Sequence, residues 1–326
     1  MKLTVTVKLQ PTPEQVDALR QTLLAANAAA NAISAYAWKE QTFGQYQLHK
    51  LLYYPIRATS GLSAQVVVRL FAKVADAYKL DHKRQRVFRP LGSIAFDERI
   101  LSWGRDTVSI WTVAGRQRIP FLCDERARRL LTAQQGETDL IYRDGQWYLA
   151  TTVNYTEPPP GEADDLLGVD LGITNIATDS DGHIYSGKQV NGLRRRHARL
   201  RAKLQRKGTR AAKRLLHKRR RKETRFASWV NHNLSKKLVT HAKDTQRAIA
   251  LEDLKGIRVR ITVRKAQRRI HHSWAFYQLR SFIEYKARMV GVPVVLVDPR
   301  NTSRTCPACG CIDKANRPSQ SKFLCV

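Results

Sequence analysis

Hydrophobic and polar residues alternate at the start of the chain. Leucine or valine occupies every second position from Leu3 to Leu9, which predicts a half-buried strand over residues 2–9. Residues 12–15 read Thr-Pro-Glu-Gln: a capping threonine, a proline at the first helical position and a glutamine three residues after the cap. Apolar residues then recur in steps of three and four from Val16 to Ala37, so a long helix follows. A second helix is expected to start at Ser63.

The pattern changes to short strands and turns from about Val87. Alternating runs predict strands over residues 93–96, 107–113, 118–121, 138–143 and 147–153. Asp144-Gly145 separates the last two runs and is a hairpin signal. Since residues 2–9 are also a strand, we expect residues 1–9 and 86–157 to form a small β-barrel. Residues 10–85 would be a helical insertion after its first strand.

Residues 158–162, Pro-Pro-Pro-Gly-Glu, predict a stiff linker between two domains. Beyond it, the apolar run 166–169 ends in Asp170, and the turn residues 179–182 lead into a further strand, so an antiparallel hairpin is expected. Two helices should follow, and after them a strand over 247–251, a helix over 273–290 and a strand over 292–297. This mixture predicts an α/β domain.

Charge is the outlying property of the composition. The 326 residues suffice for two or more domains, but 58 Lys and Arg face 27 Asp and Glu, a formal net charge of +31. A compact protein at that charge repels itself unless a polyanion neutralises it, and nucleic acid is the usual polyanion. A ribosome-associated protein and a binder of anionic membranes are the alternatives. No apolar run approaches the ~20 residues that span a bilayer, and the N-terminus has no signal-peptide core. We therefore expect a cytoplasmic protein that is nucleoid-associated when bound to DNA.

Two acids stand where buried strands should end. Asp170 follows the apolar run 166–169, and Glu252 follows the apolar run 248–251. A carboxylate at the end of a buried strand is costly unless a cation or hydrogen-bond donors satisfy it. If the two strands belong to one sheet, the acids can hold Mg²⁺, and a pair of ions there would activate water for phosphodiester cleavage. Either acid alone could instead be structural, Asp170 in a turn and Glu252 at the start of a helix.

A strongly basic segment lies between these two acids. Residues 194–225 hold seventeen Lys or Arg and only one acid, Glu223, while Leu200 and Leu204 keep helical spacing. We interpret the segment as an amphipathic helix whose basic face contacts phosphates, and a second basic run, 258–269, as lying beside the carboxylates. The expected phosphate contacts are Arg194, Arg195, Arg196, Arg199, Lys203, Arg206, Lys207, Arg210, Lys213, Arg214, Arg264 and Arg268.

Four of the five cysteines crowd into the last 21 residues. Cys306 and Cys309 flank a tight turn, the pattern of a zinc knuckle. Cys325 is expected to open a second knuckle whose fourth ligand would lie three residues farther on, so we expect the natural protein to continue past this sequence. As written, the Zn²⁺ site has Cys306, Cys309 and Cys325. Cys311 is a poor fourth ligand because it is so close to Cys309, and Cys123 has no ligand spacing.

Together these motifs resemble the TnpB (OrfB) family of insertion-sequence proteins, which is related to compact type V CRISPR effectors. The motifs occur in the expected order over about residues 158–326. They are Gly168-Val-Asp-Leu-Gly172, Leu251-Glu-Asp-Leu254, Trp274-Ala-Phe-Tyr-Gln-Leu279, Tyr285-Lys-Ala287 and Thr302-Ser-Arg-Thr-Cys-Pro-Ala-Cys-Gly310. Over the first half the resemblance is looser and rests on the opening strand and helix.

The resemblance implies an RNA-guided DNA endonuclease with a RuvC-type, RNase H-like domain over residues 158–301 and an incomplete zinc ribbon over 302–326. It implies a guide RNA from the transposon end and double-stranded target DNA as partners, with a short motif recognised beside the target. The barrel would be the wedge, and the helical insertion the recognition part. Two Mg²⁺ ions would act at three carboxylates, with Asp170 as the first, Glu252 as the second, and the third after the completed ribbon.

Two other functions are compatible with these motifs. A cleavage-deficient RNA-guided DNA-binding protein, acting as a repressor or targeting factor, would be free to lose Asp170 or Glu252, yet both acids are at their motif positions. A DNA-strand-transferring transposase with the same fold would show metal-dependent joining rather than guided cutting. We therefore expect a nuclease.

Overall fold

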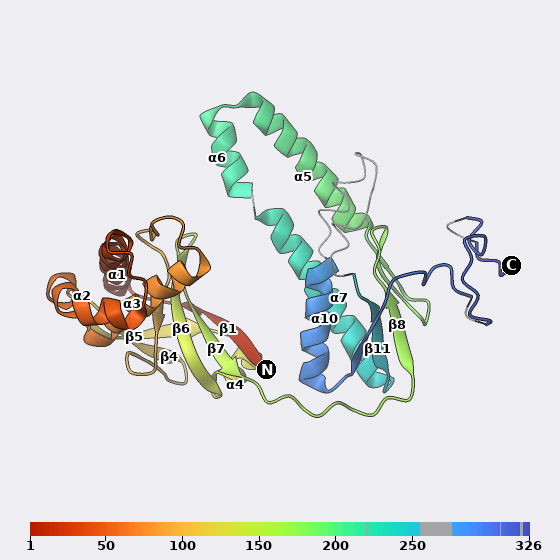
Figure 1. The fold of residues 1–326 in the computed structure, drawn as a ribbon, viewed down its shortest axis with the longest axis horizontal. Coiled ribbons are helices and arrows are strands. Elements are labelled where there is room, and N and C mark those ends of the chain that lie inside the picture. The colour runs from red at the N-terminus through yellow and green to blue at the C-terminus, as the bar shows by residue number, and fades with distance from the viewer. Residues whose placement is uncertain (220, 255–275, 307, 320–321) are drawn as a thin grey trace. The chain divides into compact units, whose positions relative to one another are not determined.

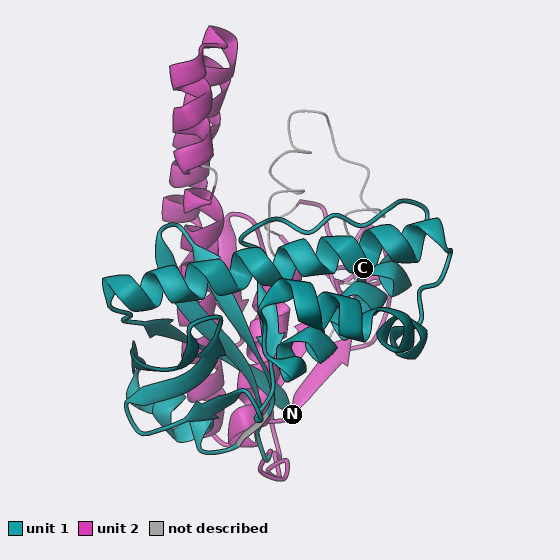
Figure 2. Cartoon of the chain, turned by 90° about the vertical axis from the view of Figure 1, so that its left-hand side faces the viewer, with its two compact units in different colours: residues 1–156 teal, residues 157–326 magenta. Residues whose placement is uncertain are grey.

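The chain forms two compact units, Met1–Thr156 and Glu157–Val326 (Figure 2). The structure is a computed structural model that describes residues 1–219, 221–254, 276–306, 308–319 and 322–326. The predicted linker, residues 158–162, lies at the start of unit 2. Each unit has its own hydrophobic core, as expected for a chain of this length.

The helices of unit 1 are α1 (Pro13–Lys39), α2 (Gln45–Ser60), α3 (Ala64–Leu80) and α4 (Glu125–Leu131). The predicted capping box of α1 is present. Thr12 Oγ1 accepts a hydrogen bond from the Gln15 backbone N–H at 3.4 Å, and Gln15 Oε1 accepts one from the Thr12 N–H at 3.1 Å. α3 begins after Ser63, as its apolar spacing predicts. The apolar pattern does not reveal α2, because the only residues of α2 that are buried are Leu48 and Ile56.

The strands of unit 1 form a seven-stranded antiparallel sheet in the order β2-β6-β7-β1-β5-β4-β3. They are β1 (Lys2–Leu9), β2 (Ile94–Phe96), β3 (Leu101–Trp103), β4 (Thr107–Thr112), β5 (Gly115–Leu122), β6 (Gln134–Arg143) and β7 (Gln146–Asn154). The edge strands β2 and β3 follow each other in the chain and are joined by residues 97–100, so the sheet nearly closes into the predicted barrel (Figure 1). The turn between β6 and β7 has positive φ at Asp144 (52°) and Gly145 (79°), which is typical of a type I′ hairpin.

The helical insertion and the barrel sheet share one hydrophobic core. Leu19 and Ile33 of α1 and Phe71 of α3 are fully buried in a cluster that also contains Val7 and Leu149 of the sheet. Each such side chain contributes roughly 1.5–3 kcal/mol through removal of apolar surface from water. The insertion is therefore packed into unit 1 as part of the same fold.

The strands of unit 2 form a five-stranded mixed sheet in the order β10-β9-β8-β11-β12. They are β8 (Leu166–Asp170), β9 (Asn175–Asp179), β10 (Ile184–Ser186), β11 (Ala248–Glu252) and β12 (Val294–Val297). β8, β9 and β10 pair antiparallel, which is the predicted hairpin and its extension. β11 is parallel to both β8 and β12, so the connections between these strands are long and helical.

Within its described residues, unit 2 has the helices α5 (Lys188–Lys207), α6 (Arg210–Arg219), α7 (Lys222–Asp244) and α10 (Phe276–Val290). The prediction of one basic helix over residues 194–225 is wrong in one respect. Gly208, with φ 63°, ends α5 in the left-handed conformation that favours glycine, so the basic residues are divided over α5, α6 and the start of α7. α5 and α6 lie side by side as an arm that extends from the sheet, which we call the basic arm (Figure 1).

One face of the unit 2 sheet is covered by α7 and α10. Leu238 of α7 and Leu279 and Ile283 of α10 are fully buried against Leu167 and Leu251 of the sheet. The apolar face of α10 is thus its packing surface. Across the part of the chain that the structure describes, no helix is long and apolar enough to cross a membrane.

Candidate active site

Asp170 and Glu252 lie at the ends of neighbouring strands. β8 and β11 are parallel with Val169 opposite Leu251, so the next residues of the two strands, Asp170 and Glu252, stand opposite each other. Neighbouring strands are about 4.8 Å apart, and residues in register on parallel strands point to the same face of the sheet. The structure therefore brings the two predicted acids together at one edge, the carboxyl end of β8 and β11.

The two acids point away from the hydrophobic core. Val169 and Leu251 are buried beneath α7 and α10, and side chains alternate in direction along a strand. Asp170 and Glu252 are consequently on the opposite face, where Asp170 is exposed and Glu252 is half-buried. Gly168 precedes Asp170 on that face and has no side chain to cover it. The carboxylates are thus accessible to water, to a cation and to a phosphodiester.

Glu252 and its neighbour Asp253 have different partners. Asp253 forms an ion pair with Arg280 of α10, whose Nε also donates to Glu284 at 2.7 Å. Glu252 Oε1 accepts a hydrogen bond from the Thr302 hydroxyl at 2.8 Å. Because that donor is neutral, the hydrogen bond orients the Glu252 carboxylate without cancelling its charge. Sequence reasoning missed Thr302, although this residue opens the cysteine motif.

Cys306, Cys309 and Cys325 come together, with their sulfur atoms all within 4.8 Å of one another and Cys309 Sγ 3.4 Å from Cys325 Sγ. Hydrogen bonds from the backbone N–H groups of Cys309 and Ala308 lower the pKa of Cys306 to about 7. The neighbouring Cys309 and Cys306 raise the pKa of Cys325 to about 12. Three sulfurs this close cannot all ionise unless a cation lies among them, and the thiolate is the form that binds metal. Cys311 stands outside the cluster, in line with the prediction that it is a poor ligand.

Asn316 holds the segment that carries Cys325 against the segment that carries Cys306. Its side chain is fully buried, and Nδ2 donates to the carbonyl oxygens of Arg304 at 2.8 Å and Cys311 at 3.1 Å. Its Oδ1 accepts from the Val326 N–H at 3.1 Å. A lone polar residue between two cysteine motifs gives no local signal for this role, so the sequence did not indicate it.

The basic arm presents most of the predicted phosphate contacts to solvent. Arg194 differs, because its side chain is only 11% exposed and lies near Glu223, whose other oxygen accepts from Arg201 at 2.9 Å. Glu223, at the start of α7, therefore attaches that helix to α5. Two predicted contacts, Arg264 and Arg268, lie outside the described residues. The predicted phosphate contacts that the basic arm exposes to solvent are Arg195, Arg196, Arg199, Lys203, Arg206, Lys207, Arg210, Lys213 and Arg214.

Asp179, His183 and His241 form a second group of possible metal ligands that the sequence pattern did not single out. Asp179 is buried and accepts from the His183 N–H at 2.8 Å, with the His183 ring Nδ1 3.1 Å away. Next to it, Asp181 receives the guanidinium of Arg247, and His241 Nε2 lies 2.6 Å from the same carboxylate. These two partners hold the pKa of Asp181 well below its usual range. Through Asp181, the β9–β10 turn is thus tied to His241 of α7 and to Arg247 in the connection between α7 and β11.

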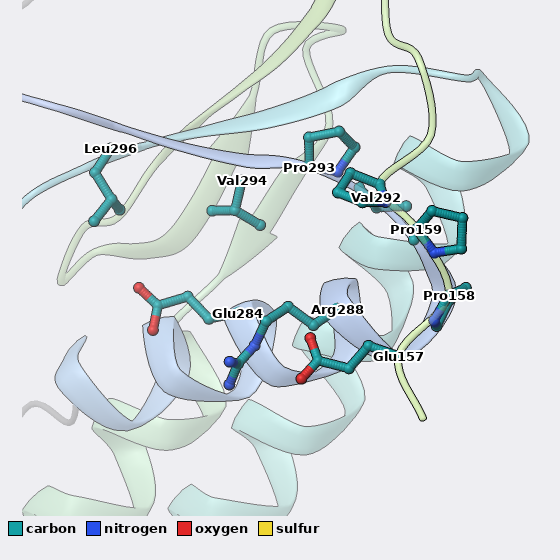
Figure 3. Close-up of a pocket in the computed structure, with 11 residues that line it drawn as sticks. Glu157, Pro158, Pro159, Glu284, Arg288, Val292, Pro293, Val294 and Leu296 are labelled. Atoms are coloured by element: carbon teal, nitrogen blue, oxygen red, sulfur yellow. The ribbon is translucent and has the colours of Figure 1, made fainter. Parts of the chain in front are cut away.

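A pocket of about 820 Å³ lies elsewhere in unit 2, between residues 157–160, α10 and β12. Figure 3 shows Glu284 of α10 on one side of it and Val294 on the other. The linker is attached here, since the Gly161 N–H donates to the Gly291 carbonyl oxygen at 2.7 Å. Neither of the paired acids lines this pocket, so it is distinct from the candidate active site.

Residues 149–258 match the family model OrfB_IS605, described as a probable transposase, and residues 276–326 match the model described as a Cas12f1-like TNB domain. A TnpB-like protein of Methanocaldococcus jannaschii is 32% identical over 164 residues, which are 47% of this chain and 59% of that protein. The chain is a relative of the TnpB proteins. The resemblance inferred from the sequence motifs is thus confirmed.

Relatives of this TnpB-like chain include CRISPR effectors. The CRISPR-associated endodeoxyribonuclease Cas12f1 of Sulfoacidibacillus thermotolerans is 30% identical over 203 residues, 56% of this chain and 46% of that protein. A solved structure of a Cas12f1-sgRNA-target DNA complex has the same fold, with a TM-score of 0.64 at 14% identity, covering 93% of this chain and 77% of that one. The chain spans about half the length of the curated relatives that it matches.

Proposed function

We propose that the protein is a transposon-associated, RNA-guided DNA endonuclease that cleaves DNA at Asp170 and Glu252. The register of β8 and β11 carries this proposal, because it brings the two motif acids to one open edge of the sheet. The acids stand in a chain with a formal net charge of +31, which favours a polyanionic substrate. Two comparisons support it: a relative is named an endodeoxyribonuclease, and a protein of the same fold was solved with sgRNA and target DNA.

The carboxylate pair fits Mg²⁺. Carboxylate oxygens are the ligands that this cation prefers, and both side chains are accessible from the open face. When bound there, Mg²⁺ would supply an activated water and stabilise the leaving oxygen of a phosphodiester. The protein's own contribution is positional: parallel pairing fixes the two carboxylates side by side, and the Thr302 hydroxyl orients Glu252.

We propose a separate role for each part of the chain. The order β10-β9-β8-β11-β12, with its antiparallel hairpin and parallel β11 and β12, supports a RuvC-type, RNase H-like assignment for residues 158–301. The barrel of unit 1, residues 1–9 and 86–157, would be the wedge, and residues 10–85 the helical recognition part. Guide RNA and double-stranded target DNA would be the partners, and a short target-adjacent motif would be recognised.

The cysteine cluster fits a structural zinc site in residues 302–326. The three sulfurs converge, and the backbone N–H groups of the turn favour a thiolate at Cys306. Zn²⁺ held there would fix the segment that begins with Thr302. Since Thr302 donates to Glu252, zinc is expected to support the active site indirectly.

The test is cleavage by the purified protein–RNA complex. The full-length gene product would be purified with its RNA and incubated with a matching duplex, with and without Mg²⁺, as wild type, Asp170→Asn and Asp164→Asn. Asp164 is an exposed acid of the same unit and controls for the loss of one charge. We expect Mg²⁺-dependent cutting by wild type and Asp164→Asn, and target binding without cutting by Asp170→Asn. A wild type that binds its target but never cuts would contradict the nuclease and favour a guided DNA-binding protein.

A further inference from the structure

The solvent face of α7 carries one aromatic residue in a row of basic and polar ones. Residues spaced three or four apart lie on one face of a helix, and this row is opposite the buried Leu234 and Leu238. All of its members are exposed: Lys222, Arg225, Trp229, Asn233 and Lys236.

Trp229 is the large apolar member of this row, and it is 61% exposed. Phe226 lies beside it with ring centroids 5.9 Å apart and an interplanar angle of 28°. A single exposed aromatic is ordinary on a protein surface. Here the indole stands between cations one helical turn before it and two turns after it, Arg225 and Lys236. An aromatic ring flanked by cations matches a base flanked by phosphates.

The direction of α7 places Trp229 toward the edge of the sheet that carries the candidate active site. α7 runs into β11 through residues 245–247, so the helix is antiparallel to the strand that ends at Glu252. From Trp229 to the end of α7 the helix is about 22 Å long, whereas β11 is about 13 Å long. The indole therefore lies beyond the edge of the sheet at which Asp170 and Glu252 stand.

We propose that Trp229 is a stacking site for an unpaired base of single-stranded nucleic acid, with Arg225 and Lys236 contacting the flanking phosphates. The proposal rests on the proposed function, since it needs a nucleic acid strand at this edge of unit 2. Stacking on an indole requires a base whose face is free, so the site distinguishes single strands from duplexes. RNA and DNA share this chemistry, and the experiment separates them.

The test combines substitutions of Trp229 with oligonucleotides that carry or lack bases. The full chain would be measured by fluorescence anisotropy with fluorescein-labelled oligothymidylate, with oligouridylate, and with an abasic strand of the same length and charge. The variants are Trp229→Ala, Trp229→Phe and Leu166→Ala. The last is a control, because Leu166 is 50% exposed at the start of β8, away from the edge at which Asp170 and Glu252 stand.

We expect Trp229→Ala to weaken binding of a base-carrying strand by about 5- to 150-fold, the range of alanine substitutions at stacked bases. The abasic strand should bind Trp229→Ala and wild type equally, because it offers phosphates alone. Trp229→Phe should restore most of the loss, and Leu166→Ala should change neither affinity. A larger loss with oligouridylate would identify RNA as the stacked strand, and a larger loss with oligothymidylate would identify DNA.

Equal losses with base-carrying and abasic strands would overturn the proposal, since the effect would then not involve a base. An unchanged affinity would overturn it as well. If that Trp229→Ala protein also differed from wild type in its sedimentation coefficient, the indole would contact protein rather than a base. None of these readouts involves cleavage, so they are distinguishable from a failure of the proposed nuclease activity.

Discussion

Replacing Asp170 with Asn is expected to stabilise the metal-free protein and to weaken its response to Mg²⁺. The substitution keeps the shape of the side chain and removes one of the two negative charges that the β8–β11 register places on neighbouring strands. The two charges are close in the folded chain and far apart in the unfolded one. Without a cation, their repulsion therefore lowers the free energy of unfolding.

Coulomb's law gives the size of the effect. With roughly 5 Å between the carboxylates, two unit charges repel by about 0.8 kcal/mol in water and by about 3 kcal/mol at an effective dielectric constant of about 20. Because Asp170 is exposed, we expect a value near the lower limit, about 1 kcal/mol, that falls as salt is added. For a domain of this size that corresponds to a rise of about 2–4 °C in Tm.

Mg²⁺ acts in the opposite direction, because it binds the carboxylate pair of the folded protein. At a free concentration ten times its Kd, it stabilises the wild type by about 1.4 kcal/mol, and Asp170→Asn should lose most of that gain. The assay is thermal unfolding in EDTA and in a Mg²⁺ series, with Asp164→Asn as the control of equal charge change. Equal responses of wild type and Asp170→Asn to Mg²⁺ would refute the reasoning, and so would an Asp170→Asn protein that is less stable in EDTA.

Three further changes test other parts of the structure. Asn316→Ala removes the buried side chain that joins the backbone at Arg304 and Cys311 to the backbone at Val326. We therefore expect a 10- to 100-fold loss of Zn²⁺ affinity, roughly the effect of removing an outer-shell contact, in a chelator competition. Burial lowers the pKa of Lys73 to about 8, below its unfolded value of about 10.4. Between these two values the unfolded chain binds a proton that the folded chain does not, so the free energy of unfolding of unit 1 should rise between about pH 8 and 10. Lys73→Met should abolish that rise in denaturant titrations. Replacing Arg199, Lys203 and Arg206 of the basic arm by Gln should reduce the salt slope of single-strand binding by about 0.7 per lost phosphate contact.

Local patterns predicted the elements whose signals are strong within a few residues. The capping box of α1, the Asp144-Gly145 turn and the strand that ends at Asp170 all follow from short-range rules, and the structure contains them. These features depend on hydrogen bonds and side-chain periodicity within one segment. Such features can therefore be predicted from the residues of the segment itself.

Elements with few buried residues were missed. α2 buries little and contains Pro55, so neither its apolar spacing nor its composition indicates a helix. α4 is short and buries none of its residues completely, although Asp124 provides a recognisable N-cap by accepting from the Ala127 N–H at 2.7 Å. The break at Gly208 was overlooked because the helical spacing of the leucines continues up to Leu204, four residues before it.

The partners of the site residues depend on contacts between distant segments. Arg280 neutralises Asp253 across 27 positions of sequence, and Thr302 reaches Glu252 across 50. No pattern within one segment specifies such pairs, because they arise only when strands and helices assemble. The acids themselves could be predicted, whereas the residues that orient or neutralise them could not.

The topology of unit 2 explains why the two acids and Trp229 of α7 lie toward the same edge of its sheet. Parallel strands joined by helical crossovers place the carboxyl ends of the strands and the beginnings of the crossover helices at the same edge of the sheet. Asp170 and Glu252 occupy the strand ends, and Trp229 is in the first half of the helix that leads into β11. The two sets of residues are on different elements and have no atom in common. Asp170→Asn should therefore keep strand affinity, and Trp229→Ala should keep the response to Mg²⁺, so that each variant isolates one of the two roles.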